Sequence, residues 1–272
     1  MNRLITLALI GLTATLTGCF EVRKNTDQLC KDTPELRCER LNMDDGQCRV
    51  PRTDLIWHRF EVFKDPTDQN LIKEYNLLSE YKKCLELASQ IQPIDQSNLK
   101  QRRFEALVNS GKDLEALVKK LSESTSPQAL YFLWSRTGSD SARRAFLQME
   151  GSPQLESAEM QYALATFYTG RDQEKTIALL KHALELTKSS PVNVEILKSL
   201  ASIHYQTQQR EQAYVWAMVA KAFDVPIASE KELQLLYGFD KDKYRQLDAF
   251  ADNIEDAIRA GKFQRQQLEG LD

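Results

Sequence analysis

Length, composition and charge place this chain among folded globular proteins. Of its 272 residues, 42% are hydrophobic and 28% are charged, which is enough apolar material for a sizeable core and unlike a disordered chain. The formal net charge is −3, and basic pairs such as Arg102-Arg103 and Lys119-Lys120 are interspersed with acidic residues. This balance argues against nucleic acid as a partner.

The first eighteen residues have the organisation of an export signal. A short cationic start, Met1 to Arg3, is followed by Leu4 to Leu16, an apolar stretch without a charged residue. This stretch is shorter than the roughly 20 apolar residues that a membrane-spanning helix requires. We therefore predict that residues 1–18 are a signal peptide.

Residues 16–19, Leu-Thr-Gly-Cys, resemble the lipobox that the bacterial lipoprotein signal peptidase reads. The resemblance implies that Cys19 carries the lipid and becomes the acylated N-terminus, so that several acyl chains hold the mature protein at a membrane. Phe20 stands where Asp favours inner-membrane retention in Gram-negative lipoproteins, which implies the periplasmic face of the outer membrane. The alternative is an ordinary export signal followed by a chance cysteine.

Four further cysteines, Cys30, Cys38, Cys48 and Cys84, are disulfide candidates. Their even number and the oxidising compartment implied by the signal predict two disulfides, and three connectivities are open. Because Cys84 lies in a strongly helical stretch, we expect one bridge to join the N-terminal segment to that helix. The gaps between the cysteines are far from the paired C-x-x-C spacing of zinc sites, so no metal is expected.

The chain beyond the cysteine-bearing segment is predicted to be helical. Residues 55–63 fit both a strand and a helix, and we favour the helix. Asp65 and Pro66 resemble an N-cap and first-turn proline for a long amphipathic helix that ends at Pro93. Shorter helices bounded by Gly, Ser or Pro follow at residues 98–109 (ending at Gly111), 112–121, 127–136, 139–149 and 154–169.

Residues 157–223 contain an internal repeat. The segment 158–186 aligns with the segment 195–223 at a shift of about 36 residues, and each copy is predicted to form one helical hairpin. Small residues such as Ala183 and Ala220 let neighbouring helices approach closely.

These two copies resemble the tetratricopeptide class of repeats. The matching residues are Leu164-Ala165 with Tyr168 in the first copy, and Glu211-Gln212-Ala213 leading through Trp216 to Ala220 in the second. Thr176 departs from the Ala that is usual in the family. The resemblance implies an all-α fold of stacked helical hairpins, a tetratricopeptide-like α-solenoid with a disulfide-bearing N-terminal cap. The whole chain is also similar to an uncharacterised family of Gram-negative lipoproteins, which supplies no activity.

The predicted organisation has three segments. A signal peptide at 1–18 precedes a lipid-anchored, cysteine-containing segment at 19–65 and a helical repeat-like domain at 66–272. The clearest repeats in that domain are residues 157–189 and 194–225. A last amphipathic helix is expected to cap the stack, and the polar tail 264–272 is expected to fray.

Sequence motifs for catalysis, metal binding or cofactor binding were not found. The three histidines, His58, His182 and His204, lack metal-ligand spacing and are predicted to be structural or solvated. The chain has no G-x-S-x-G motif and no Gly-rich phosphate-binding loop. We therefore predict no catalytic residue and no cofactor, although sequence alone does not reveal a pair of carboxylates held across a cleft.

The functional prediction is a lipid-anchored periplasmic scaffold or adaptor that binds a protein or peptide partner at the cell envelope. Polar or amphipathic residues on the first helices of the repeats, Gln161, Tyr205 and Gln206, are the candidate partner-binding residues. The alternatives are a cell-wall-acting hydrolase and an envelope structural or assembly lipoprotein. A deep pocket with convergent carboxylates would favour the hydrolase.

Overall fold

A computed structural model of the chain describes residues 25–92, 97–188 and 191–271, and these residues form helices without a strand. The helical expectation for residues 55–63 is confirmed, because they lie within α2. Lys64 ends this helix, and its ammonium lies over the ring of Phe60. The predicted lipidation site, Cys19, lies outside the described residues. Within the described residues, no helix combines the length and the apolar character needed to cross a membrane.

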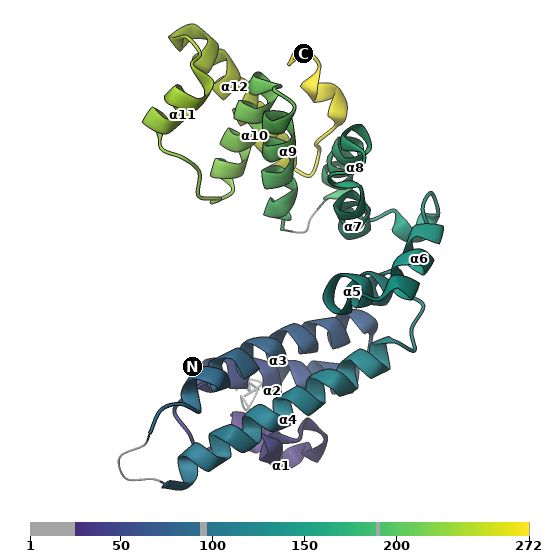
Figure 1. Cartoon of the computed structure of the whole chain (residues 1–272), viewed down its shortest axis with the longest axis vertical. Helices are drawn as coiled ribbons and strands as arrows, with labels where there is room; N and C mark the ends of the chain where they lie inside the picture. Colours follow the sequence, from purple (N-terminus) through teal and green to yellow (C-terminus); the bar gives the residue numbers. More distant parts are fainter. Residues whose placement is uncertain (1–24, 93–96, 189–190, 272) are drawn as a thin grey trace, which may run out of the picture. The chain divides into compact units, whose positions relative to one another are not determined.

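The chain divides into two compact units, which are drawn in Figure 1. The first unit comprises residues 1–65 and 76–111, and the second comprises 66–75 and 112–272. The long helices α3 (Asp68–Ala88) and α4 (Ser97–Leu121) therefore contribute residues to both units. The other helical elements of the first unit are α1 (Thr26–Asp32), η1 (Pro34–Leu36), η2 (Cys38–Arg40) and α2 (Arg49–Lys64).

The second unit continues with short helices separated by short connectors. Ser126 and Ser139 cap the first two by accepting backbone N–H bonds, and Gly138 between them adopts the left-handed conformation that ends a helix. The remaining helical elements are α5 (Pro127–Thr137), α6 (Asp140–Gln148), η3 (Pro153–Leu155), α7 (Ala158–Tyr168), α8 (Gln173–Leu186), α9 (Val194–Gln206), α10 (Arg210–Ala222), α11 (Glu230–Tyr237), α12 (Lys241–Arg259) and η4 (Arg265–Leu268).

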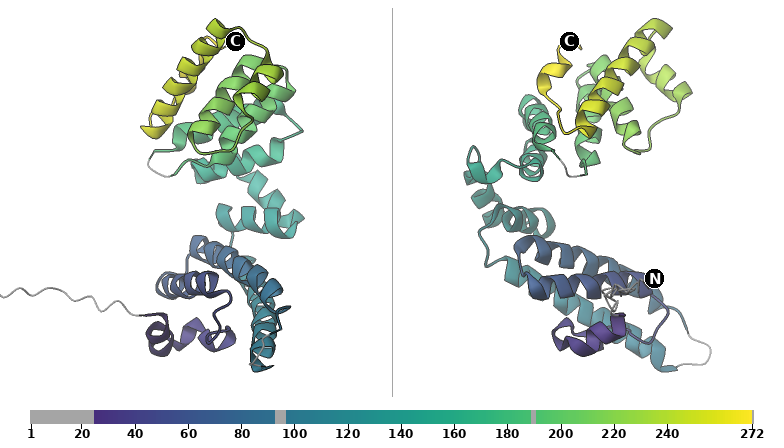
Figure 2. Two further views of the ribbon diagram at one scale, coloured as in Figure 1. Left: turned by 90° about the vertical axis from the view of Figure 1, so that its left-hand side faces the viewer. Right: turned by 180° about the vertical axis from the view of Figure 1, so that it is seen from behind.

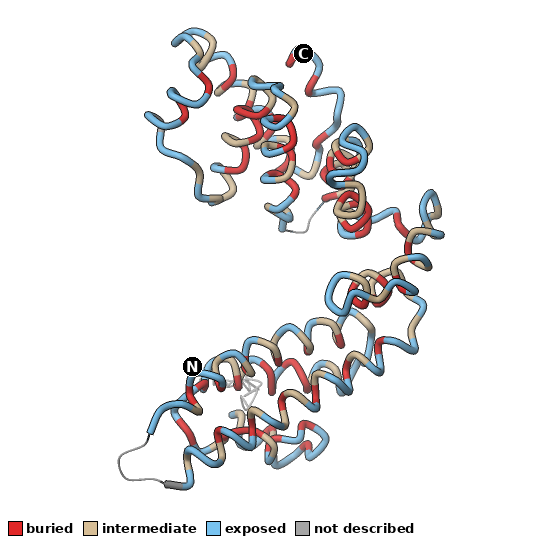
Figure 3. The backbone as a smooth tube through the Cα atoms, viewed as in Figure 1, coloured by how far each residue is buried: buried red, intermediate tan, exposed pale blue. Residues whose placement is uncertain are grey.

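The repeated segment forms two helical hairpins, as predicted. Helix α7 packs against α8, α9 packs against α10, and α8 contacts α9 (Figure 2). Buried residues, drawn red in Figure 3, recur along α9 and α10. Trp216 is 1% exposed and Leu200 is fully buried in the apolar cluster that these helices share with α12.

The predicted break at Gly111 is wrong, because α4 runs through it as one 25-residue helix. Gly111 has an ordinary helical backbone, and a Cβ at this position would point into open space. Glycine costs about 1 kcal/mol in a helix interior. The apolar and small residues Ala106, Ser110, Leu117 and Leu121 are buried along one side, and their packing outweighs this cost.

Two other helix boundaries differ from the prediction. Helix α3 begins at Asp68, because the hydroxyl oxygen of Thr67 caps it by accepting the backbone N–H of Asn70 at 3.4 Å. The helix ends at Ala88, before Pro93. Residues 153–155 form the separate turn η3, so α7 begins only at Ala158. Ser157 caps α7.

The expected fraying of the C-terminal tail is also wrong for residues 264–271. Phe263, Leu268 and Leu271 are buried in the apolar cluster of the second unit. Arg265 donates to Glu185 of α8 through Nη2 at 2.7 Å and through its backbone N–H at 2.9 Å. The tail is polar by composition, but its few apolar residues point into the core.

Candidate functional site

All four disulfide candidates pair in the first unit. Cys30 bonds to Cys38, and Cys48 bonds to Cys84, with Cα–Cα distances of 5.9 and 5.7 Å. The second bridge joins the start of α2 to α3, which confirms that one disulfide ties the N-terminal segment to the helix that holds Cys84. The structure thereby selects one of the three open connectivities.

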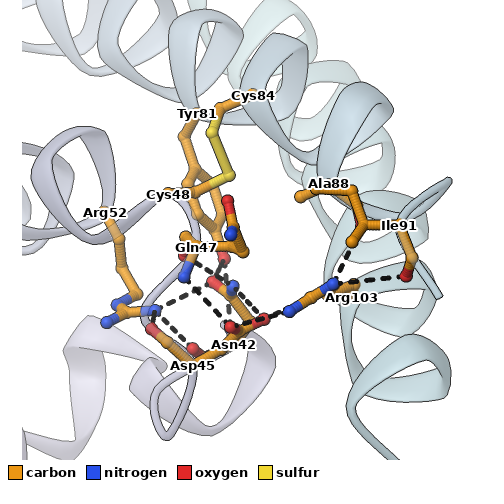
Figure 4. Close-up of polar contacts among 10 residues, drawn as sticks. All are labelled: Asn42, Asp45, Gln47, Cys48, Arg52, Tyr81, Cys84, Ala88, Ile91 and Arg103. Carbon is orange, nitrogen blue, oxygen red and sulfur yellow. Dashed lines mark hydrogen bonds and ion pairs between the residues drawn. A yellow bond between two sulfur atoms is a disulfide. The ribbon is translucent and has the colours of Figure 1, made fainter. Parts of the chain in front are cut away.

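A buried polar network surrounds the Cys48–Cys84 disulfide (Figure 4). Tyr81 donates its hydroxyl to Asn42 Oδ1 at 2.6 Å and accepts the backbone N–H of Asn42 at 3.1 Å. Asn42 in turn donates its side-chain amide to the carbonyl of Gln47 at 3.0 Å. Burial raises the pKa of Tyr81 to about 12, so its hydroxyl stays a neutral donor at physiological pH.

Two arginines complete this network. Arg103 and Asp45 form an ion pair whose side chains are each 5% exposed, and Arg103 also donates to the carbonyl of Ala88 at 3.1 Å. Arg52 donates to the carbonyl of Asp45 at 2.9 Å and to Asn42 Oδ1 at 3.1 Å. Burial raises the pKa of Asp45, but the hydrogen bonds from Arg103, Gln47 and Asn42 outweigh it and hold that pKa below its usual value. These groups satisfy one another, which is what a structural network requires.

An open cavity of about 420 Å³ in the second unit is the better candidate for binding. Tyr214 of α10 and Tyr244 of α12 stand in its wall, and their rings are 5.1 Å apart in an edge-to-face arrangement. The Tyr214 hydroxyl donates to Asp248 at 2.7 Å. The remaining lining residues are apolar, amide-bearing or charged with either sign: Leu233, Gln234, Lys241, Asp242 and Arg245.

Aromatic side chains connect this cavity to the surface of α9. Tyr205 is 47% exposed, and its ring lies 6.3 Å from that of Tyr237, which lies 5.4 Å from the ring of Tyr214. Arg210 donates to the carbonyls of Leu236 and Tyr237 and so holds the end of α11 beside α10. Leu235 is 89% exposed on α11. Pockets that combine aromatic walls with a few polar groups are typical of binding sites.

The three predicted partner-binding residues differ in their exposure to solvent. Gln161 is wrong as a groove residue, because it is 5% exposed and donates its amide to the carbonyl of Leu155 at 2.9 Å. Tyr205 and Gln206 are exposed on the last turn of α9. Binding by them stays a prediction. The periodicity of the last helix does not identify Tyr244 as a cavity residue, because periodicity does not reveal which apolar side chain borders a hollow.

The histidines occupy three different environments. His58 is buried in α2, and His204 is 2% exposed with Nδ1 2.6 Å from Gln209 Oε1. Burial lowers the pKa of His204. His182 lies between two carboxylates, Glu156 at 2.9 Å and Glu185 at 3.2 Å. No group of three or more His, Cys, Asp or Glu residues in the described part could hold a metal ion.

Comparison with known proteins gives one match. A family model described as "Protein of unknown function (DUF2989)" matches residues 16–218. No curated protein matches the chain. No solved structure matches it either. Among the cavity-lining residues, Tyr214 lies inside the matched span, and those of α11 and α12 lie beyond it.

Proposed function

The chain belongs to the DUF2989 family, and from this premise we propose that it is a lipid-anchored periplasmic scaffold or adaptor that binds a protein or peptide partner at the cell envelope. The lipid on Cys19 fixes the chain at the outer membrane. This raises the effective concentration of the adaptor for partners held at the same surface. Binding is thus the whole mechanism.

The disulfides support the periplasmic location in this proposal. Two cysteine pairs within the first unit are bonded, and disulfides persist in oxidising compartments such as the periplasm. The export signal and the lipobox-like residues 16–19 point to the same compartment.

The binding role is carried by the cavity between α10, α11 and α12. A partner side chain entering it would contact the two tyrosine rings, while charges of both signs at Lys241, Asp242 and Arg245 would orient its backbone or polar groups. The exposed Leu235 extends the apolar surface of α11. We also propose that the hairpins stack as in tetratricopeptide repeats, and the packing of α7 on α8 and of α9 on α10 supports this.

Photocrosslinking in intact cells tests the proposal. A photoreactive residue is placed at Leu235, and a matched control is placed at Asp140, an exposed residue of α6 that lines none of the cavities described here. We expect one defined protein to crosslink through position 235 and not through position 140. The same crosslink should weaken in a Tyr244→Ala variant, which removes part of the cavity wall.

The Cys19→Ala variant tests the anchor. We expect it to leave the membrane fraction and to lose the crosslink at position 235, because the partner is held at the same surface. If no protein crosslinks specifically through position 235 while the chain stays on the membrane, the adaptor proposal is rejected. If the alanine variant stays on the membrane, the lipid anchor is rejected.

One observation favours the hydrolase as a second candidate. A cavity of about 530 Å³ is lined by Glu156 and Glu159, and partial desolvation raises the pKa of Glu159, which is the direction that favours a general acid. Glu156 also contacts His182. Release of soluble fragments from purified cell walls, abolished by both Glu156→Gln and Glu159→Gln, would support this activity. Fragment release that persists in both variants, or no release by the wild type, would reject it.

A further inference from the structure

A groove in the first unit lies at the point where the described chain begins. Its cavity of about 540 Å³ is lined by Asn25, the first described residue, by the start of α1, by Met43 and by the first turns of α2. Only residues 20–24 separate Asn25 from Cys19. Six residue steps span at most about 20 Å when fully extended. If Cys19 carries the lipid, this groove is held within that distance of the membrane.

The outward face of α2 beside the groove carries exposed apolar side chains. Val50 is 66% exposed and lines the groove, and Trp57 is 38% exposed two helical turns further along. Residues seven positions apart lie on the same side of a helix. The opposite side of α2 is buried through Arg52, Leu55 and Arg59. Tryptophan is favoured at membrane interfaces, where its ring meets apolar chains and its N–H meets water.

The charges of the groove fit one kind of membrane surface. Three exposed charged residues of both signs, Arg49, Asp27 and Asp54, stand in the lining of the groove. A purely anionic surface would be attracted by Arg49 and repelled by Asp27 and Asp54. A zwitterionic phospholipid headgroup carries a phosphate and an ammonium group, and it can pair with both signs.

We infer that this face of the first unit, formed by the groove and the outward side of α2, docks on the zwitterionic phospholipid surface beside the lipid anchor. The inference rests on the proposed lipid anchor and adds an orientation to it. Val50 and Trp57 enter the interfacial layer, and the exposed charges of Arg49, Asp27 and Asp54 pair with phospholipid headgroups. The first unit then contacts the membrane directly, and this contact does not require the partner-binding cavity.

Fluorescence quenching in vesicles tests the orientation. Lipidated full-length protein is reconstituted into phosphatidylethanolamine-rich vesicles that contain phospholipids with brominated acyl chains, which quench nearby tryptophans. We expect quenching in the wild type and in Trp134→Phe, the matched control in the second unit, and loss of most of it in Trp57→Phe. A Val50→Glu variant should also lose most of the quenching, whereas Leu235→Glu, which adds the same charge to an exposed residue of α11, should not.

Flotation of the same samples separates this inference from the anchor. Chains that float with the vesicles while Trp57 remains unquenched would overturn the docking and leave the anchor intact. Chains that do not float would overturn the anchor, and the inference with it. The quenching is finally measured in vesicles rich in the anionic lipid phosphatidylglycerol, where we expect it to be weaker. Equal or stronger quenching there would contradict recognition of a zwitterionic surface.

Discussion

The two units of the chain are stabilised by different physical means. The first unit holds both disulfides and the buried charged side chains of Asp45, Arg52, Arg59 and Arg103. The second unit contains a continuous apolar cluster built around residues such as Trp216, Leu200 and Ile254. Most of the large apolar side chains that are exposed in the described residues belong to the first unit: Val50, Trp57, Phe63, Leu87, Ile91, Phe104 and Val108.

The first unit compensates for a limited core by covalent and polar means. A short segment with few buried apolar residues gains little hydrophobic stabilisation, and covalent bridges or satisfied polar networks supply the remainder. The second unit has enough repeated hairpins to bury its apolar faces against one another. We therefore expect substitutions to act on the two units through different mechanisms.

The largest effect is expected in the core of the second unit. Trp216→Ala removes a side chain that is 1% exposed, and it should cost about 3–5 kcal/mol in the free energy of unfolding. Hydrogen exchange resolved by peptide should show lost protection in α9, α10 and α12. Faster exchange confined to α1 and α2 would contradict a separate apolar cluster.

Removal of the Cys48–Cys84 bridge should be the next largest effect. The bridge spans 36 residues, and replacing both cysteines with Ala should destabilise the first unit by about 3–4 kcal/mol through restored freedom of the unfolded chain. The matched control is the Cys30–Cys38 pair, which spans eight residues and should cost about 2–3 kcal/mol. Denaturant titrations measure both variants. Equal losses would argue against a role for loop length.

A smaller effect is expected for the tyrosine of the polar network. Tyr81→Phe leaves buried groups of Asn42 without their partner and should cost about 1–3 kcal/mol. Tyr214→Phe is the control, because its hydroxyl bonds to the partly exposed Asp248 and should contribute less than about 1 kcal/mol. Thermal unfolding of both variants measures the difference. A larger loss for Tyr214→Phe would reverse the assigned roles.

The smallest effect is expected for the ion pairs that hold the C-terminal tail. Hydrogen bonds from Arg265 lower the pKa of Glu185 to about 2, against an ordinary value of 4.5. This stabilisation is present above pH 4.5 and is lost as the pH falls towards 2. Because Arg265 is half exposed, Glu185→Gln should cost only about 1 kcal/mol at neutral pH.

The stability of the same tail should change with pH near neutrality, because His182 titrates there. Burial lowers the pKa of His182, but hydrogen bonds to Glu156 and Glu185 outweigh it and raise that pKa above the ordinary 6.5. The stabilisation by His182 is therefore complete below pH 6.5 and is lost as the pH rises through the raised pKa. Exchange protection of residues 263–271 across this range is the measurement. Protection that rises with pH in the wild type, or an unchanged profile in His182→Gln, would contradict the prediction.

Sequence periodicity predicted the helices at residues 127–136 and 139–149 and located the two hairpins, because apolar residues recur at intervals of three and four between clear stop signals. It also predicted that Cys84 pairs with the N-terminal segment. It misjudged Gly111, where local propensity favours a break but burial on both sides of the glycine maintains the helix.

Which side chains converge depends on how the helices pack, and periodicity does not predict it. The Cys48–Cys84 bridge, the anchoring of the tail by Arg265 and the cavity beside Tyr214 and Tyr244 depend on contacts between segments far apart in the sequence. Gln161 turns inward to the carbonyl of Leu155, which lies in the separate turn η3. Helical periodicity identifies the buried side of an element, because burial repeats with each turn. It does not specify the neighbouring element that covers this side, because that choice depends on how all the helices pack together.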